Sequence, residues 1–211
     1  MFEATVTRLM SGQFICQVSD PVGYEFLTRN DLHNGKTNSE DVNQFLARVG
    51  MKLSTTQSGT AFYCSHLDID DQGKKAAKAL FAELKNNLRL LVDFFKLVMD
   101  TTGNDFSVNP GQKLDLNRLG AVISQNQNLV EALRKVALMC KGVGGDTDRG
   151  RLEKVVKKLK LDGYLIEVNK EQDIYQFTGK VEFFHDTLQF LMQHDQISEE
   201  DEAFNDKVDS Q

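Results

Sequence analysis

The chain repeats one pattern of hydrophobic and polar positions. In each copy, apolar residues at helical spacing end at a glycine, and two short stretches with strand character follow around a polar turn. The helix, first strand, turn and second strand of the first copy cover 42–49, 51–56, 57–59 and 60–66. Those of the second copy cover 152–159, 164–168, 169–172 and 173–177. A helix that leads into a β-hairpin is the central part of a winged helix, so the pattern predicts two of them.

The residues before the first hairpin predict the rest of an N-terminal winged helix over 1–67. The expected elements are a helix over 2–10, a strand over 14–18, a helix from 21 and a helix capped at 38 or 39. Asp20 followed by Pro21 is a strong start signal. An N-cap carboxylate accepts hydrogen bonds from free amides, and proline presets φ at the first helical position.

A long amphipathic helix over 74–100 is expected within a connecting segment over 68–102. Its apolar stripe is Leu80, Leu84, Leu88, Leu91, Phe95 and Val98. Further apolar positions widen the stripe, so this helix should be covered on more than one side. After it we expect a loop over 101–112, helices over 115–124 and 128–140, the second hairpin unit, and a final helix over 180–193.

The predicted fold class is therefore mainly α with small β-hairpins, an α+β protein. Tandem winged-helix domains, over 1–67 and 103–194, would be joined by the long helix. Residues 195–211 would follow as an acidic, disordered tail.

Charge is distributed unevenly along the chain. The formal net charge is -6, and residues 195–211 contain seven acids and one base. Residues 1–194 therefore hold 24 basic and 24 acidic side chains. A neutral body argues against a dedicated DNA-binding protein, which usually has a cationic excess, and it favours protein partners.

Candidate reaction chemistry is sparse. Gly142 to Gly145 follows a predicted helix and lacks the lysine and hydroxyl of a phosphate-binding loop, so an inter-helix loop is expected. Cys64 and His66 could be two zinc ligands, but no second close pair exists and strand alternation explains their spacing equally well. We expect no cofactor, no metal and no catalytic residue, and hence no enzyme. An enzyme of unknown type is the weakest of the hypotheses.

Cysteine usage and hydropathy indicate the compartment. The three cysteines, Cys16, Cys64 and Cys140, are odd in number and far apart, which is typical of reduced core residues. No apolar run is as long as a membrane span. We therefore expect a soluble cytoplasmic protein.

A cationic surface on the helix of the second copy is a candidate DNA contact. Its residues are Arg149, Arg151, Lys154, Lys157 and Lys158. On a helical wheel the three lysines fall opposite the apolar stripe that contains Leu152. They could contact phosphates in the major groove, or they could form a solvated face that Asp148 and Glu153 partly balance. Both interpretations stay open.

The hairpin aromatics are candidates for partner binding. They are Phe62, Tyr63, Tyr175 and Phe177. Alternation along a strand directs some of these side chains inward and others outward. Core packing should explain most of them, and any that point outward would anchor a bound peptide.

Several segments resemble the MukE and MksE family, the small accessory subunits of bacterial SMC condensins. They are Leu9–Val18, Tyr24, Leu27, Val42–Gly50 and Thr60–Tyr63. The resemblance covers the first 67 residues in detail and the remainder through architecture. It implies a kleisin-interacting tandem winged-helix protein.

The same resemblance implies a nucleoid-associated homodimer. Such a dimer would bind the kleisin near the heads of the SMC ATPase, which would hydrolyse the ATP. The complex would organise or segregate chromosomal DNA, or restrict plasmids. The alternative is a stand-alone winged-helix transcription regulator, motivated by the cations over 149–160 and requiring sequence-selective duplex binding.

Overall fold

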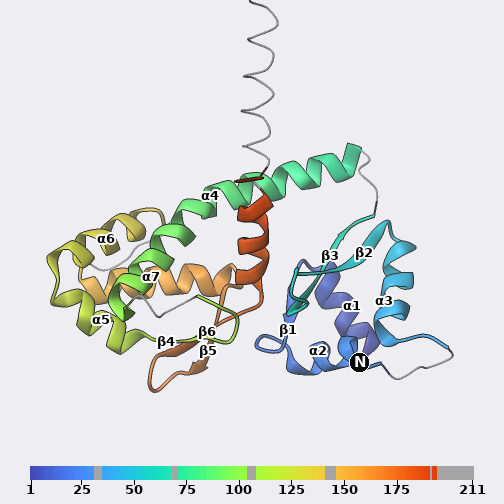
Figure 1. Cartoon of the computed structure of the whole chain (residues 1–211), viewed down its shortest axis with the longest axis horizontal. Helices are drawn as coiled ribbons and strands as arrows, with labels where there is room; N and C mark the ends of the chain where they lie inside the picture. Colours follow the sequence, from blue (N-terminus) through green and yellow to red (C-terminus); the bar gives the residue numbers. More distant parts are fainter. Residues whose placement is uncertain (31–34, 68–70, 104–107, 141–145, 191, 194–211) are drawn as a thin grey trace, which may run out of the picture.

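The structure is a computed structural model with two halves joined by one long helix (Figure 1). It describes residues 1–30, 35–67, 71–103, 108–140, 146–190, 192 and 193, and the backbone alone for 71–86. Helices predominate and two small antiparallel sheets accompany them, which confirms the predicted α+β class. The expected acidic tail over 195–211 and the glycine-rich loop over 142–145 lie outside the described residues.

The N-terminal half, residues 1–67, follows the predicted order of elements. They are α1 (Phe2–Met10), β1 (Ile15–Cys16), α2 (Pro21–Thr28), α3 (Asn38–Ala47), β2 (Met51–Thr55) and β3 (Ala61–His66). The strands form one sheet in the order β1-β3-β2. The buried side chains beneath the sheet are Val6, Leu9, Ile15, Leu27, Val42, Leu46 and Phe62.

Local chemistry fixes where α2 and α3 begin. The Asp20 carboxylate accepts a hydrogen bond from the Gly23 amide at 3.0 Å, which confirms the predicted start of α2. The cap of α3 is Thr37, so the prediction of a cap at 38 or 39 was wrong. Thr37 forms a capping box in which the Glu40 carboxylate accepts a hydrogen bond from the Thr37 amide at 2.7 Å. Because the glutamate lies three residues after Thr37, only that cap position completes the box.

The long helix α4 (Asp71–Thr102) begins three residues before the predicted start at 74. Its second half lies in the hydrophobic core of the C-terminal half. The buried side chains are Leu90, Leu91, Phe94, Phe95, Leu97 and Val98. They occupy more than one side of the helix, as predicted from the widened stripe. The side chains of Leu80 and Leu84, also in that stripe, are not among those described.

The C-terminal half, residues 103–193, repeats the arrangement with one strand that we did not predict. Its elements are β4 (Lys113–Asp115), α5 (Leu116–Ser124), α6 (Gln127–Leu138), α7 (Asp148–Leu161), β5 (Leu165–Asn169), β6 (Ile174–Phe177) and a last helix over 180–190. The sheet order β4-β6-β5 matches the first sheet. The sequence predicted a loop over 101–112 and a helix from 115, with no strand between them. Only Leu114 in β4 is apolar, and its partner Tyr175 is distant in sequence.

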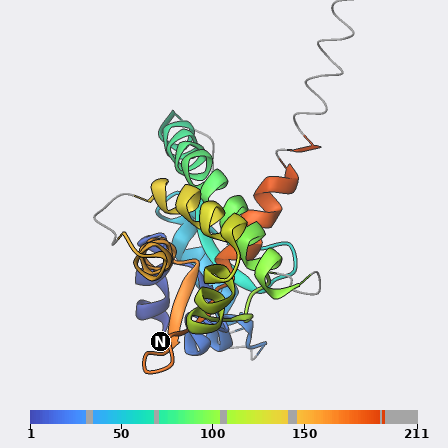
Figure 2. The ribbon, with the colours of Figure 1, turned by 90° about the vertical axis from the view of Figure 1, so that its left-hand side faces the viewer.

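The last helix stands between the two halves (Figure 1). Seen from the side of the C-terminal half, it crosses behind α4 (Figure 2). On one side, Val181 and Phe184 are fully buried in the core of the C-terminal half. On the other side, the Phe183 ring lies 5.1 Å from that of Phe14 and 5.0 Å from that of Tyr63, measured between centroids. One helix therefore belongs to the C-terminal core and also contacts the sheet of the N-terminal half.

Replacing Phe95 with alanine should strongly destabilise the protein. The Phe95 ring lies 5.9 Å from that of Phe177 and 5.8 Å from that of Phe184, so its loss leaves a cavity between α4, β6 and the last helix. We expect the free energy of unfolding, measured by urea denaturation, to fall by about 3–5 kcal/mol. The control is Val92→Ala on the same helix, where the side chain is 43% exposed. Equal destabilisation by both variants would contradict this account of the core.

Candidate functional site

The five candidate cations of α7 differ in their partners within the chain. The helix buries Leu152, Val155, Val156 and Leu159. Arg149 donates from Nη2 to Asp173 at 2.7 Å, from Nη1 to Asn117 at 2.8 Å and from Nε to Glu153 at 2.6 Å. The Glu153 bond, followed by that to Asp173, raises the pKa of Arg149 against the opposing effect of burial. The Arg149 guanidinium therefore binds partners within the chain.

The Arg149 network fixes the turn of the second hairpin. Among the described residues, Asp173 is the only non-glycine residue with a positive φ, at 53°. Such a conformation persists where surrounding interactions hold it. Arg149 binds the Asp173 side chain, and the Asn117 amide donates to the Gln172 carbonyl at 3.1 Å. The start of α7 and the start of α5 are thereby tied to the hairpin.

Two other candidate cations also have carboxylate partners. Arg151 contacts Asp148 at 2.7 Å, and the Lys158 ammonium donates to Asp162 at 2.6 Å. Within the described part of the chain, no carboxylate forms an ion pair with Lys154 or Lys157. Lys157 is exposed and Lys154 is half-exposed. The positive charge available to a ligand on α7 is therefore concentrated on these two lysines.

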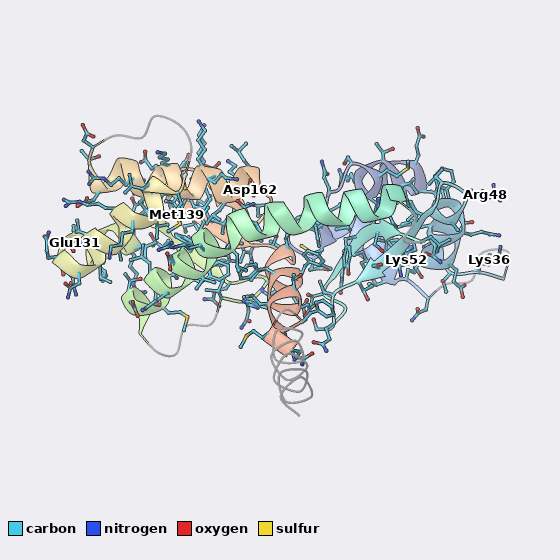
Figure 3. All side chains as sticks on the ribbon, turned by 90° about the horizontal axis from the view of Figure 1, so that it is seen from above. Lys36, Arg48, Lys52, Glu131, Met139 and Asp162 are labelled. Atoms are coloured by element: carbon cyan, nitrogen blue, oxygen red, sulfur yellow. The ribbon has the colours of Figure 1, made fainter. Side chains whose placement is uncertain are left out.

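Large apolar side chains are exposed at the ends of α6 and α7. Leu138, at the end of α6, is 85% exposed, and Leu161, at the end of α7, is 76% exposed. Burial raises the pKa of the neighbouring Cys140 thiol, while Lys154 and Lys158 act on it in the opposite direction. The end of α6 therefore lies near these lysines. Figure 3 marks Met139 and Asp162, which directly follow the two leucines.

We call Leu138, Lys154, Lys157 and Leu161 the α6–α7 surface. Sequence reasoning identified the lysines but missed both leucines. Leu138 lies off the apolar stripe of α6, which contains Leu129, Leu133 and Val136, and Leu161 lies off that of α7. An apolar residue outside the buried stripe was the signal that could have revealed them.

The four candidate aromatics are placed mainly in cores. Phe62 is 8% exposed in the N-terminal core and Phe177 is fully buried in the C-terminal core. Tyr175 is half-buried and packs against the C-terminal core. Tyr63 packs between the two halves, stacked 5.2 Å from Phe14, and burial followed by the charge of Asp186 raises its pKa. Core and interface packing account for Phe62, Phe177 and Tyr63, whereas Tyr175 remains partly exposed.

Two surface hollows accompany these features. A hollow of about 400 Å³ is lined by His185, Leu188, Gln189, Met192 and Gln193. A second, of about 250 Å³, lies between α4, β4 and α5, with Thr101, Lys113 and Arg118 in its wall. Over the residues that the structure describes, no group of His, Cys, Asp or Glu side chains is arranged to hold a metal ion. Nor does any described helix have the length and apolar character needed to cross a membrane.

The fold and these surfaces define a small helical protein with exposed apolar and cationic positions on one pair of helices. A family model described as condensin complex protein MksE matches residues 1–189. The match covers most of the chain, so the chain belongs to the MksE family of condensin accessory subunits. No curated protein matches it. The predicted resemblance is confirmed, and the family is in general non-catalytic.

Replacing Arg149 with alanine should loosen the second hairpin without unfolding the chain. The variant removes the hydrogen bond to Asp173 in the turn and the one to Asn117 in α5, together with a bond to Glu153 within α7. We expect a loss of about 1 kcal/mol in the free energy of unfolding and faster amide hydrogen exchange over 169–173. Lys157→Ala, on the exposed side of the same helix, is the control. Unchanged exchange in the Arg149 variant would show that the network does not hold the turn.

Proposed function

We propose that this chain is a non-enzymatic condensin subunit that binds the kleisin as a homodimer, with each half a winged helix. The family match over residues 1–189 is the observation that carries the proposal. The repeated order of a short strand, helices and a hairpin, with sheets β1-β3-β2 and β4-β6-β5, supports the winged-helix assignment. The complex would act in the cytoplasm on the nucleoid, in chromosome segregation or plasmid restriction, and ATP hydrolysis would belong to the SMC partner.

The α6–α7 surface is the proposed kleisin contact. The two leucines are 85% and 76% exposed, and both would gain free energy by leaving water at an interface. Together with Lys154 and Lys157 on α7, they favour a partner segment with both apolar and acidic side chains. Of the four aromatics considered from the sequence, Tyr175 is kept as a partner contact. Phe62 and Phe177 lie in cores, and Phe14 and Phe183 cover Tyr63.

Contact with DNA is proposed to be direct, weak and non-specific. Lys154 and Lys157 have no carboxylate partner in the described chain, so they can approach phosphates without breaking an ion pair. Arg149, Arg151 and Lys158 would have to exchange a carboxylate for a phosphate, which reduces their net contribution. The family match gives no support to a stand-alone transcription regulator.

The chain should co-elute with the kleisin encoded in the same operon. We expect size-exclusion chromatography with light scattering to give a complex that contains two copies of this chain. The double substitution Leu138→Asp with Leu161→Asp should weaken binding at least tenfold, because it places carboxylates where apolar contacts form.

The control for the kleisin experiment is Val22→Asp on α2. Val22 is 56% exposed and lies in the other half, so its substitution should leave the complex intact. Failure of the unmodified pair to form a complex would refute the proposed function. A stable complex that is unaffected by the leucine substitutions would refute only the assigned surface.

Duplex binding should be salt-sensitive and indifferent to sequence. We expect fluorescence anisotropy to show that Lys154→Glu with Lys157→Glu weakens binding equally on unrelated duplexes. The slope of log K against log salt should fall by about 1 for each phosphate that the variant no longer binds.

Lys52→Glu, an exposed position in the N-terminal half, is the charge-matched control. It should leave duplex binding close to that of the unmodified protein. Equal weakening by Lys52→Glu and the α7 variant would contradict the assigned contact. Strong preference for one duplex would favour the transcription regulator instead.

A further inference from the structure

The turn of the first hairpin donates hydrogen bonds to two carboxylates from the other half of the chain. Glu182 accepts hydrogen bonds from the Thr56 hydroxyl at 2.8 Å, from the Ser58 amide at 3.3 Å and from the Thr60 hydroxyl. Asp186, one helical turn later, accepts a hydrogen bond from the Gln57 amide at 2.9 Å. Two backbone amides and two hydroxyls therefore converge on two carboxylates. We call residues 56–60 the donor turn.

Conformation explains why this turn presents its donors together. Gly59 has a φ of +74°, a left-handed conformation that glycine adopts without strain. The Tyr24 hydroxyl donates to the Gly59 carbonyl at 3.2 Å and anchors the turn to α2. Consecutive amides and hydroxyls in such a turn form a concave site for an anion. In this chain the anion is supplied by the last helix.

The backbone comes unusually close where the last helix begins. The Gly179 amide donates to the Cys16 sulfur at 3.2 Å. A Cβ atom at Gly179 would lie 2.5 Å from the Cβ of Ala61 and 2.9 Å from that of Cys16. Any other residue at this position would push the two halves apart. Contact between Glu182 and the donor turn therefore depends on the absence of a side chain at Gly179.

The two sides of the last helix differ in how firmly they are held. Val181 and Phe184 are fully buried in the C-terminal core, whereas Glu182, Phe183 and Asp186 are only half-buried against the N-terminal half. Contacts within a chain that are partly polar and partly exposed allow one unit to move relative to the other. The helix should therefore stay with the C-terminal half when the contact with the N-terminal half breaks.

We propose that the last helix is a latch and that the donor turn is an oxyanion site which the latch occupies. In the closed state, Glu182 and Asp186 accept the hydrogen bonds of the amides and hydroxyls in the donor turn. The negative charge of these carboxylates repels other anions from the first hairpin. In the open state, the same amides and hydroxyls bind a phosphate group, because phosphate and carboxylate oxygens accept the same hydrogen bonds. The first hairpin thus contacts nucleic-acid phosphates only after the halves separate.

The first test opens the latch in two independent ways in the full-length chain. Glu182→Ala with Asp186→Ala removes the acceptors, and Gly179→Ala inserts a methyl group between the halves. We expect amide exchange at Gln57 and Ser58 to accelerate at least about tenfold in both variants, together with a larger radius of gyration in small-angle scattering. Circular dichroism should show that the helical content is kept.

Matched controls separate the latch from general effects of charge or volume. Glu131→Ala with Glu171→Ala removes two exposed carboxylates elsewhere in the C-terminal half. Gly120→Ala adds a methyl group that would lie at an ordinary distance of 3.7 Å from Leu152. Both controls should exchange like the unmodified chain. Exchange at Gln57 and Ser58 that stays at the unmodified rate in the Glu182 and Asp186 variant would overturn the latch.

The second test asks whether the open turn binds an oxyanion. Inorganic phosphate is titrated into the Glu182→Ala, Asp186→Ala variant, and the amide resonances of Gln57 and Ser58 are followed by NMR. We expect saturable shifts in the variant and none in the unmodified chain, where the carboxylates fill the site. The absence of shifts in the variant, or equal shifts in both proteins, would overturn the assignment of an oxyanion site.

Discussion

The packing of the last helix against both halves determines the shape of the molecule. Phe184 lies against Phe95 and Tyr164 in the C-terminal core, while the adjacent Phe183 contacts Phe14 and Tyr63 in the other half. Neighbouring residues on a helix point about 100° apart, so two consecutive aromatics can pack against two different parts of the molecule. The relative orientation of the two sheets, and of every surface on them, follows from this one helix.

Several charged side chains of this protein bind partners within the chain and hold its turns in place. Arg149 holds the second hairpin through Asp173, and Glu182 holds the first through Thr56 and Ser58. A carboxylate stabilises one turn by accepting from a main-chain amide and from hydroxyl groups, and a guanidinium stabilises the other by donating to a side chain. The neutral composition of residues 1–194 is consistent with this use, because many of the charges serve partners within the chain. The same pairing leaves Lys154 and Lys157 as the cations of α7 that are open to a ligand.

Helical periodicity and capping signals predicted the elements that depend on neighbouring residues. Elements that form only by pairing with residues distant in sequence could not be predicted. The start of α2 at Pro21 and the buried stripe of α7 follow from neighbouring residues, so both could be predicted from the sequence. Strand β4 could not, because three residues with one buried leucine acquire strand structure only by pairing with β6. The sequence identified the five cations of α7 as candidates and left their role open. The ion pairs of Arg151 with Asp148 and of Lys158 with Asp162 are local, whereas the contacts of Arg149 with Asn117 and Asp173 form only in the folded chain.

The distance in sequence between the donor turn and its carboxylates sets an order of events during synthesis. Thr56 and Glu182 are separated by 126 positions, so the N-terminal half leaves the ribosome long before the helix that covers it is made. Domains generally fold as units, N-terminal first. The Gln57 and Ser58 amides therefore spend a period of translation bound only to water, and the two halves become one body only after the helix over 180–190 has been made.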